Sequence, residues 1–440
     1  MPRQIYSAEA QQLKDRTLVV DNGAYTIKAG FASPASAAET PACHIIPNCI
    51  ARSPRDKKTY IASDLAQCRD FGELAFRRPM EKGFIVNWES ERAIWEHSFF
   101  DEQAVLKCDP HETNLVLTEA PNCPLALQTN CDQMVFEEFE FGGIIGAWVR
   151  PSLNAYNDIP ALFSAPPSLL PTELLLLIDS GYSHTTITPL LSGRPLHPAI
   201  RRLDIGGKHL TNYLKETIST HGTYDVMDET HLINQVKEDA CYVSSSFAAD
   251  LEKTWKGGQR DAKQADTSIV VDYVLPDYEN VKRGFMRPHD PAQSRLRRAG
   301  PVHGPREDVL PLGNERFSVP ELLFEPRDVG LREAGLPELV MQCLEALPVG
   351  LRPAMLANVA VVGGNALIKG FVERLEREIR ARAPAEWVVR MASPEDPITY
   401  TWNGGARFAS DRERLKSVVV TREEYLEHGV NLLRRRWGAK

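Results

Sequence analysis

The sequence predicts an α/β fold in which short buried strands alternate with amphipathic helices. Three apolar runs, at residues 18–20, 174–178 and 359–362, each end in a turn that contains glycine, as is typical of buried strands. Between and behind them, apolar residues recur every three to four positions, which indicates helices that bury one face. Strands that alternate with helices favour sheets covered by helices.

The first two apolar runs share one continuation. The first is followed by Asp-Asn-Gly at 21–23, and the second by Asp-Ser-Gly at 179–181, 158 positions later. This repetition suggests two similarly built halves. Backbone N–H groups of an Asp-x-Gly turn can point toward one site and bind phosphate oxygens, while the carboxylate can hold the water shell of Mg²⁺. The third turn, Gly363-Gly364-Asn365, would let a flat base approach the backbone.

Helical stripes accompany the turns. Leu210, Leu214 and Ile218 recur every four residues behind a pair of glycines, and residues 232, 236, 240 and 243 keep a similar spacing. Residues 367, 371, 375 and 379 form a third stripe opposite a face rich in Glu and Arg. We expect all three stripes to belong to the core.

Composition excludes several classes of protein. The 440 residues are 43% hydrophobic and 25% charged, which is globular rather than disordered, collagenous or coiled-coil. The net charge of −8 argues against binding nucleic acid over the whole surface. Eight cysteines without a C-x-x-C pair predict reduced thiols. No apolar run approaches the roughly 20 residues that cross a bilayer, so we expect a soluble, cytosolic or nuclear protein with no membrane partner.

One segment, residues 279–309, differs in charge from the rest of the chain. Between 282 and 308 it holds seven Lys or Arg and three Asp or Glu, a net charge of +4. Its low apolar content predicts a mobile surface insertion. Such a segment is either a solvated loop or a contact element for a partner.

Common catalytic motifs are absent from the sequence, which contains no phosphate-binding G-x-x-x-x-G-K-[ST], no H-E-x-x-H and no G-x-S-x-G. The sequence instead resembles the actin family, within the actin, hexokinase and Hsp70 superfamily. The matching stretches follow the family order over nearly the whole chain: 19–23 with 28–32, 86–88, 117–121, 203–207, 237–238 with 241–243, 313–317 and 402–405.

This resemblance implies an actin-like two-domain fold around a nucleotide cleft. It places residues 1–160 plus 403–440 in the first domain and 161–402, with the basic insertion 279–309, in the second. It also implies a site for ATP or ADP with Mg²⁺, with Asp21 and Asp179 on the metal side through water and Lys28 as a phosphate counter-charge. The implied nucleotide-binding residues are Asp21, Asn22, Gly23, Lys28, Asp179, Ser180, Gly181, Gly207, Lys237, Glu238, Gly363, Gly364 and Asn365.

Several departures from actin weaken the expected chemistry. In the first turn Ala24-Tyr25 replaces actin's Ser-Gly, which removes a hydroxyl and adds bulk, and in the second Tyr182-Ser183 replaces Asp-Gly, which removes a carboxylate. We expect the tyrosines to fill part of the phosphate site. The segment that aligns with actin's water-positioning glutamine, residues 146–150, contains no glutamine, and the histidine position falls at Thr186. Because such groups contribute about 10² to 10⁴ in rate, we expect no catalytic residues and little turnover. The nearby His184 is expected to lie on the surface.

Within the family, residues 225–239, 22–25, 179–183 and 272–277 resemble a nuclear branch of actin-related proteins. The resemblance implies a structural subunit of a SWR/SRCAP-class chromatin remodeller, which exchanges a variant histone into nucleosomes. The expected partners are other remodeller subunits, with contact to protein, nucleosome or DNA through 282–308, and the expected location is the nucleus, with the cytoplasm as a second location. The alternative is an actin-like ATPase or filament-forming protein, but the charged loop at 50–60 disfavours filaments.

Overall fold

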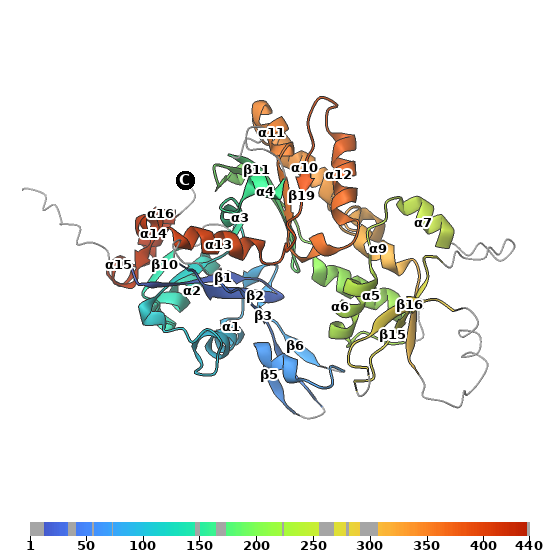
Figure 1. Ribbon diagram of the computed structural model, residues 1–440, viewed down its shortest axis with the longest axis horizontal. Coiled ribbons are helices and arrows are strands. Elements are labelled where there is room, and N and C mark those ends of the chain that lie inside the picture. The colour runs from blue at the N-terminus through green and yellow to red at the C-terminus, as the bar shows by residue number, and fades with distance from the viewer. Residues whose placement is uncertain are drawn as a thin grey trace, which may run out of the picture.

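The computed structural model describes residues 13–33, 41–54, 57–72, 74–145, 150–163, 173–221, 224–254, 268–278, 281–290 and 307–437. Figure 1 shows the strands of the N-terminal part, in blue and cyan, beside the C-terminal helices in red. The middle of the chain forms a second group of strands and helices. No described helix is both long and apolar enough to cross a membrane.

The first large sheet joins both ends of the chain. Within the described residues it has the order β20-β10-β9-β1-β2-β3. The strand β1 pairs antiparallel with β2 and parallel with β9. The bounds are β1 Arg16–Asn22, β2 Thr26–Phe31, β3 His44–Pro47, β9 Thr113–Leu117, β10 Gly143–Ile145 and β20 Val420–Thr421.

The second large sheet repeats this plan. Its order is β13-β12-β11-β18-β19, and β14 pairs with β12. The strand β11 pairs antiparallel with β12 and parallel with β18, as β1 does with β2 and β9. The sequence prediction of two similarly built halves is therefore confirmed. The bounds are β11 Leu174–Ser180, β12 Thr185–Leu191, β13 Arg194–Pro195, β14 Arg201–Leu203, β18 Val359–Val362 and β19 Met391–Ala392.

Helices cover both large sheets, so the expected α/β architecture is correct. Helices and turns of the first half are α1 Trp88–Trp95, α2 Leu125–Gln133, α3 Arg150–Asn154, α13 Tyr400–Ser410, α14 Arg412–Val418, α15 Arg422–His428 and α16 Val430–Trp437, with π-helical turns at Glu96–Phe100 and Met134–Glu138 and 3-10 turns at Ala62–Gln67 and Pro110–Glu112. Those of the middle are α4 Ile159–Leu162, α5 Gly207–His221, α6 Thr230–Ala240, α7 Phe247–Thr254, α9 Glu315–Glu321, α10 Leu336–Glu345, α11 Arg352–Leu356 and α12 Phe371–Arg382, with 3-10 turns at His197–Ala199, Pro326–Val329, Val349–Leu351 and Gly364–Leu367.

The predicted core stripes are buried with one exception. Leu210, Leu214 and Ile218 on α5 lie in the core of the second half. Leu367, however, is 58% exposed. It lies in the 3-10 turn before α12, and Gly370 at the helix start breaks the register that its spacing suggested. The predicted domain limit at 402/403 falls inside α13, and the domain limits remain a prediction.

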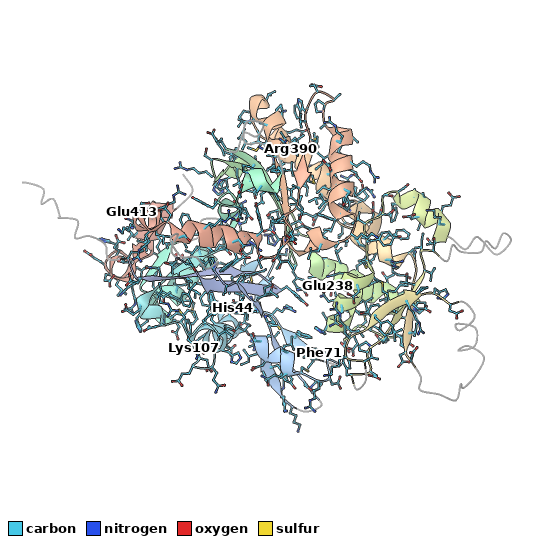
Figure 2. The ribbon with its side chains drawn as sticks, in the orientation of Figure 1. His44, Phe71, Lys107, Glu238, Arg390 and Glu413 are labelled. Carbon is cyan, nitrogen blue, oxygen red and sulfur yellow. The ribbon has the colours of Figure 1, made fainter. Side chains whose placement is uncertain are left out.

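Smaller sheets lie at the outer ends of the two halves. One contains β5 Thr59–Ile61, β4 Ile50–Arg52 and β6 Ala75–Arg77. Another contains β16 Phe285–Pro288, β15 Val271–Val274 and β17 Val309–Leu312, and a hairpin joins β7 Met80–Glu81 to β8 Phe84–Ile85. In Figure 2, Phe71 lies near the first small sheet and Glu238 near the middle of the molecule.

The first part of the predicted mobile surface insertion has regular secondary structure and is exposed, as a surface segment would be. Residues 285–288 form β16, which pairs with β15 in a ladder from Val271 to Val274. Two of the basic side chains are also used within the fold: Arg283 pairs with Asp239, and Arg287 pairs with Glu307, each at 2.8 Å. The backbone hydrogen bonds between these strands stabilise the segment although it contains few apolar side chains. Residues 279–280 and 291–306 of the predicted insertion lie outside the described residues.

Candidate functional site

A cavity of about 540 Å³ lies between the two aspartate hairpins. Most of the sequence-predicted site residues line it: Gly23, Lys28, Asp179, Gly181, Gly207, Lys237, Glu238, Gly363, Gly364 and Asn365. Asp21, Asn22 and Ser180 are not among the lining residues, and at most 4% of each is exposed. The topology thus brings three turns, far apart in the sequence, to one place.

Asp21 is fully buried at the end of β1. Its carboxylate accepts a hydrogen bond from Thr118 Oγ1 at 2.7 Å, and Lys28 Nζ lies 3.9 Å away. Burial alone would raise the pKa of Asp21, but Arg150, Lys28 and the Thr118 hydrogen bond hold it below its usual value. Asp21 therefore carries a negative charge at neutral pH.

Asp179 holds the corresponding position on β11 and has fewer partners around it. Its Oδ2 atom lies 3.3 Å from Arg150 Nε. Burial raises the pKa of Asp179, Arg150 opposes that rise, and the nearby Asp21 carboxylate adds to it. The two aspartates share a pattern in the sequence but differ in how well their charge is stabilised.

Arg150 lies between these two carboxylates. Its Nε atom is 3.3 Å from Asp21 Oδ1 and 3.3 Å from Asp179 Oδ2, and its side chain is 19% exposed. Nη2 donates to Asp21 Oδ2 at 3.4 Å, whereas Nε, although buried, is not aligned for a hydrogen bond. The two carboxylates raise the pKa of Arg150 above its usual value although burial lowers it. The guanidinium is therefore held mainly by charge.

The position of Arg150 follows from how α3 packs against α13. A Cβ atom on Gly404 of α13 would lie 2.0 Å from the Leu153 carbonyl oxygen, so only glycine allows this approach. Thr401 Oγ1 also donates to Asn154 Oδ1 at 3.1 Å. The helix that begins at Arg150 is thereby fixed beside both hairpins.

The two turn tyrosines lie against each other. The ring centroids of Tyr25 and Tyr182 are 4.8 Å apart, and the Arg78 guanidinium lies 4.6 Å from the Tyr25 ring and 5.3 Å from the Tyr182 ring. Asn234 Nδ2 donates to the Tyr25 hydroxyl at 3.2 Å. The tyrosines therefore line the cavity beside the turns, and their filling of a phosphate site remains a prediction.

Polar groups on the base side of the cavity are largely engaged. Lys237 Nζ donates to Gly207 O, Thr211 Oγ1 and Asn234 Oδ1, and burial lowers its pKa to about 8. The N–H of Gly207 donates to Gly181 O, and that of Lys208 to Tyr182 O. These N–H groups at the start of α5 close the second hairpin instead of facing the cavity.

Asn365 and Gly363 hold the third turn against the second hairpin. Asn365 Nδ2 donates to Ser180 Oγ at 3.0 Å and to Gly181 O at 2.9 Å. Gly363 has φ of 91°, and a Cβ there would lie 2.4 Å from Ser180 O. Asn365 therefore acts on the hairpin itself, and Gly363 permits the close approach of Ser180. The approach of a flat base to this turn remains a prediction.

His184 was expected on the surface, and this was wrong. It lines the cavity, and a Cβ on Gly83 would lie 2.2 Å from its ring. Burial lowers the pKa of His184 to about 3, so the ring is neutral. The turn between β7 and β8 reaches across from the first half and covers it.

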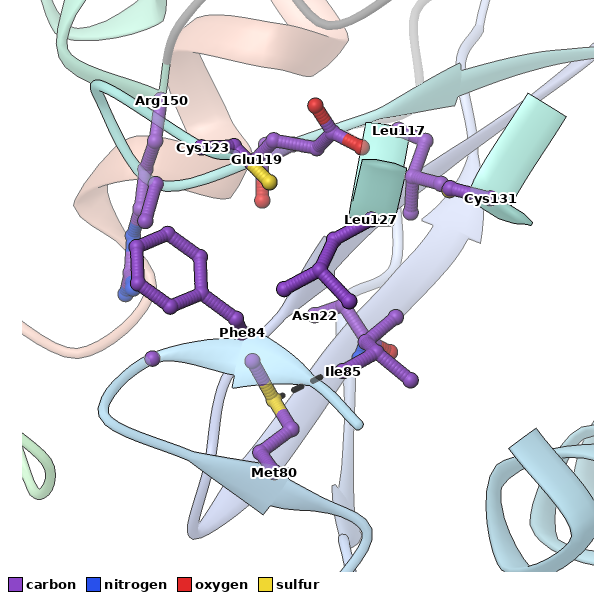
Figure 3. A pocket seen from close by; sticks show the side chains of 13 residues that line it. Asn22, Met80, Phe84, Ile85, Leu117, Glu119, Cys123, Leu127, Cys131 and Arg150 are labelled. Carbon is purple, nitrogen blue, oxygen red and sulfur yellow. Dashed lines mark hydrogen bonds between the residues drawn. The ribbon is translucent and has the colours of Figure 1, made fainter. Parts of the chain in front are cut away.

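Sequence reasoning missed Arg150, Arg78 and Glu91. In the segment 146–150 the informative residue is the arginine rather than the absent glutamine, and residues 146–149 lie outside the described residues. Glu91 is fully buried beneath the first hairpin, where burial raises its pKa to about 7. Figure 3 shows a smaller neighbouring cavity, lined by Arg150, Phe84 and Asn22 among others, with the Asn22–Met80 hydrogen bond dashed.

The residues present do not fit a magnesium ion between the hairpins. Asp21 and Asp179 are of the right chemical type, but Arg150 faces both of them. A dication there would lie next to a guanidinium that keeps its charge. No group of three or more acidic, His or Cys side chains within the described residues could hold a metal elsewhere.

Comparison with known proteins agrees with this architecture. A family model described as "Actin" matches residues 12–438, so the chain belongs to the actin family, and its fold is actin-like. The chain is 51% identical to Actin-related protein 6 of Neurospora crassa, with 96% of this chain and 94% of the relative covered. It is 49% identical to Actin-like protein arp6 of Aspergillus fumigatus (97% and 95% covered) and 34% identical to Actin-related protein 6 of Drosophila melanogaster (95% and 98% covered). Within the family, its similarity is thus to actin-related protein 6.

Proposed function

We propose that this chain is a nuclear, non-enzymatic subunit of a chromatin-remodelling complex of the SWR/SRCAP class, which exchanges a variant histone into nucleosomes. Similarity to the actin-related protein 6 group supports the choice of complex. The position of Arg150 between Asp21 and Asp179 is the observation that supports the absence of enzymatic activity. Hydrolysis of a nucleotide needs a metal ion and an oriented water molecule at this point, and the guanidinium takes that space.

A phosphate-release assay tests the absence of catalysis. Purified protein with Mg²⁺-ATP should release phosphate at the rate of buffer alone, because the groups that orient water are missing. The matched control is the Asp179→Ala variant, which should be indistinguishable from the wild type. Release above background that disappears in this variant would show an ATPase and support the alternative function.

The proposed contact with remodeller subunits is assigned to the basic segment 282–308. Because Arg283 and Arg287 are paired within the fold, Arg295, Arg297 and Arg298 are the residues to test. Replacing these three with Ala should reduce co-purification with the remodeller from cell extracts. The control is Ala at Arg412, Arg414 and Lys416, which removes three exposed positive charges from α14. Equal recovery of both variants would contradict this contact.

We also propose that the protein does not form filaments. The loop between β4 and β5 carries a charged, proline-containing sequence, and burying such a tip in a neighbouring molecule costs desolvation. The protein should remain in the supernatant after high-speed centrifugation in Mg²⁺ and salt at high protein concentration. Reversible pelleting would contradict this proposal.

A further inference from the structure

The described parts of the two halves contact each other at several levels. At the deepest level, Arg150 faces Asp21 of the first half and Asp179 of the second. In the middle, Arg78 and Tyr25 of the first half pack on Tyr182 of the second. At the outer end, Phe71 stacks on His231 with ring centroids 4.3 Å apart.

The deepest level requires a cation. Two buried carboxylates near each other are unfavourable, because burial penalises each charge and their repulsion adds to the penalty. The Nε atom of Arg150 is equidistant from the nearest oxygen of each, at 3.3 Å. Because Nε makes no aligned hydrogen bond, it stabilises the negative charges of the two carboxylates by electrostatic attraction at short distance, as a metal ion would.

The two carboxylates differ in how much other support they have, because Lys28 acts on both charges but forms its ion pair with Asp21. Asp21 has Lys28 and Thr118 beside it, whereas the ion pair with Arg150 is the closest charge contact of Asp179. The Arg150 guanidinium is therefore the main group that compensates Asp179, and it connects Asp179 to the first half at the same time. Arg150 is well placed for this role because α3 contacts both α13 and β12.

We propose that Arg150 is a resident counter-cation: its guanidinium takes the place of a divalent cation between Asp21 and Asp179, and holds the two halves together with neither metal nor nucleotide bound. The contact between the two halves then depends on the charge of a side chain rather than on a bound metal ion, which can dissociate. This inference goes beyond the remodeller role and is independent of it. The halves of a chain that assembles with other proteins could be held together either by a side-chain cation or by a bound metal ion and nucleotide.

The contacts in the middle and at the outer end also hold the two halves together. Arg78 Nη1 donates to the backbone carbonyls of Tyr25 and Asn48, so its guanidinium is fixed on the first half while it meets the Tyr182 ring. Lys82 of the β7–β8 turn pairs with Asp204 of the second half at 3.7 Å, and Arg202 donates to the Lys82 carbonyl. None of these contacts involves a site for a free ion.

Thermal unfolding with and without divalent metal tests the proposal directly. The wild-type protein should unfold at the same temperature in EDTA, Mg²⁺ or Mn²⁺, because its cation is built in. The Arg150→Ala variant should unfold at a lower temperature in EDTA and regain about 3 °C at a metal concentration a hundredfold above its Kd. The double variant Arg150→Ala with Asp179→Ala should lose this metal response.

Two further variants separate this role from general packing. Arg316→Ala removes a guanidinium that donates to the carbonyls of Ala240 and Ile269, so it should destabilise the protein without any metal response. Arg150→Lys keeps a positive charge and should respond to metal much less than Arg150→Ala. A wild-type protein stabilised by Mg²⁺, or an Arg150→Ala variant that folds and ignores metal, would overturn the proposal. The wild-type measurement decides even if Arg150→Ala fails to fold, and neither outcome depends on phosphate release or complex assembly.

Discussion

The two aspartate hairpins have nearly the same sequence pattern but rest on different supports. The first hairpin is backed by an ionisable side chain: Asn48 Nδ2 donates to Gly23 O at 3.0 Å and to the Glu91 carboxylate. The second is backed by neutral groups, since Asn365 and Thr185 both contact Ser180. Their aspartates differ too, because the pKa is lowered for Asp21 and raised for Asp179. Neighbours, rather than the motif, decide the electrostatics of each turn.

The largest difference is expected when each aspartate is neutralised. Asp21→Asn would leave Lys28 buried without its carboxylate partner and should destabilise the protein by about 3 kcal/mol. Asp179→Asn removes a charge that burial already disfavours, while Arg150 keeps Asp21, so it should cost only about 1 kcal/mol. Urea unfolding of both variants at neutral pH measures the difference. Equal losses would show that the hairpins are electrostatically equivalent.

The second difference concerns pH and belongs to the first hairpin alone. The pKa of Glu91 is about 7 in the folded protein, above its unfolded value, so between these values the folded state binds a proton that the unfolded state has lost. This contribution to stability is complete at low pH and disappears as pH rises toward 7 and beyond. The Glu91→Gln variant lacks it.

Relative to Glu91→Gln, the wild-type protein should therefore lose about 2 kcal/mol of unfolding free energy between pH 5 and pH 8. Unfolding curves of the two proteins over this range measure it. The exposed Glu138→Gln variant serves as a control and should follow the wild type. An unchanged gap between wild type and Glu91→Gln at all pH values would contradict a buried, protonated Glu91.

The smallest effect is expected at the tyrosines. Tyr25→Phe removes the hydroxyl that accepts from Asn234 across the cavity and should cost about 1 kcal/mol. Limited proteolysis should also show faster cleavage between the halves. Tyr425→Phe loses a hydrogen bond to Glu137 within the first half, so it should reduce stability without faster cleavage there. Identical cleavage patterns would show that the Tyr25 hydroxyl does not help to join the halves.

Much of the fold follows from local sequence. The apolar runs that end in glycine turns form β1, β11 and β18. A strand that is buried on both faces consists of a short run of apolar side chains bounded by a turn, so it can be recognised from the sequence alone. Leu210, Leu214 and Ile218 are in the core because their spacing puts them on one helix face. Irregular elements were harder: β16 was missed because its pairing with β15, rather than its own apolar content, makes it a strand.

The sequence by itself determined the family, the two hairpins and the three turns that line the cavity. Only the tertiary structure decided what lies between the turns. Arg150 is 129 positions from Asp21, and no local pattern indicates that its guanidinium reaches both aspartates. Ion pairing, burial and the pKa values of buried groups depend on which side chains meet in space, whereas turns and strands depend mainly on neighbours along the chain. The same Asp-x-Gly motif can therefore face a metal ion in one protein and an arginine in another.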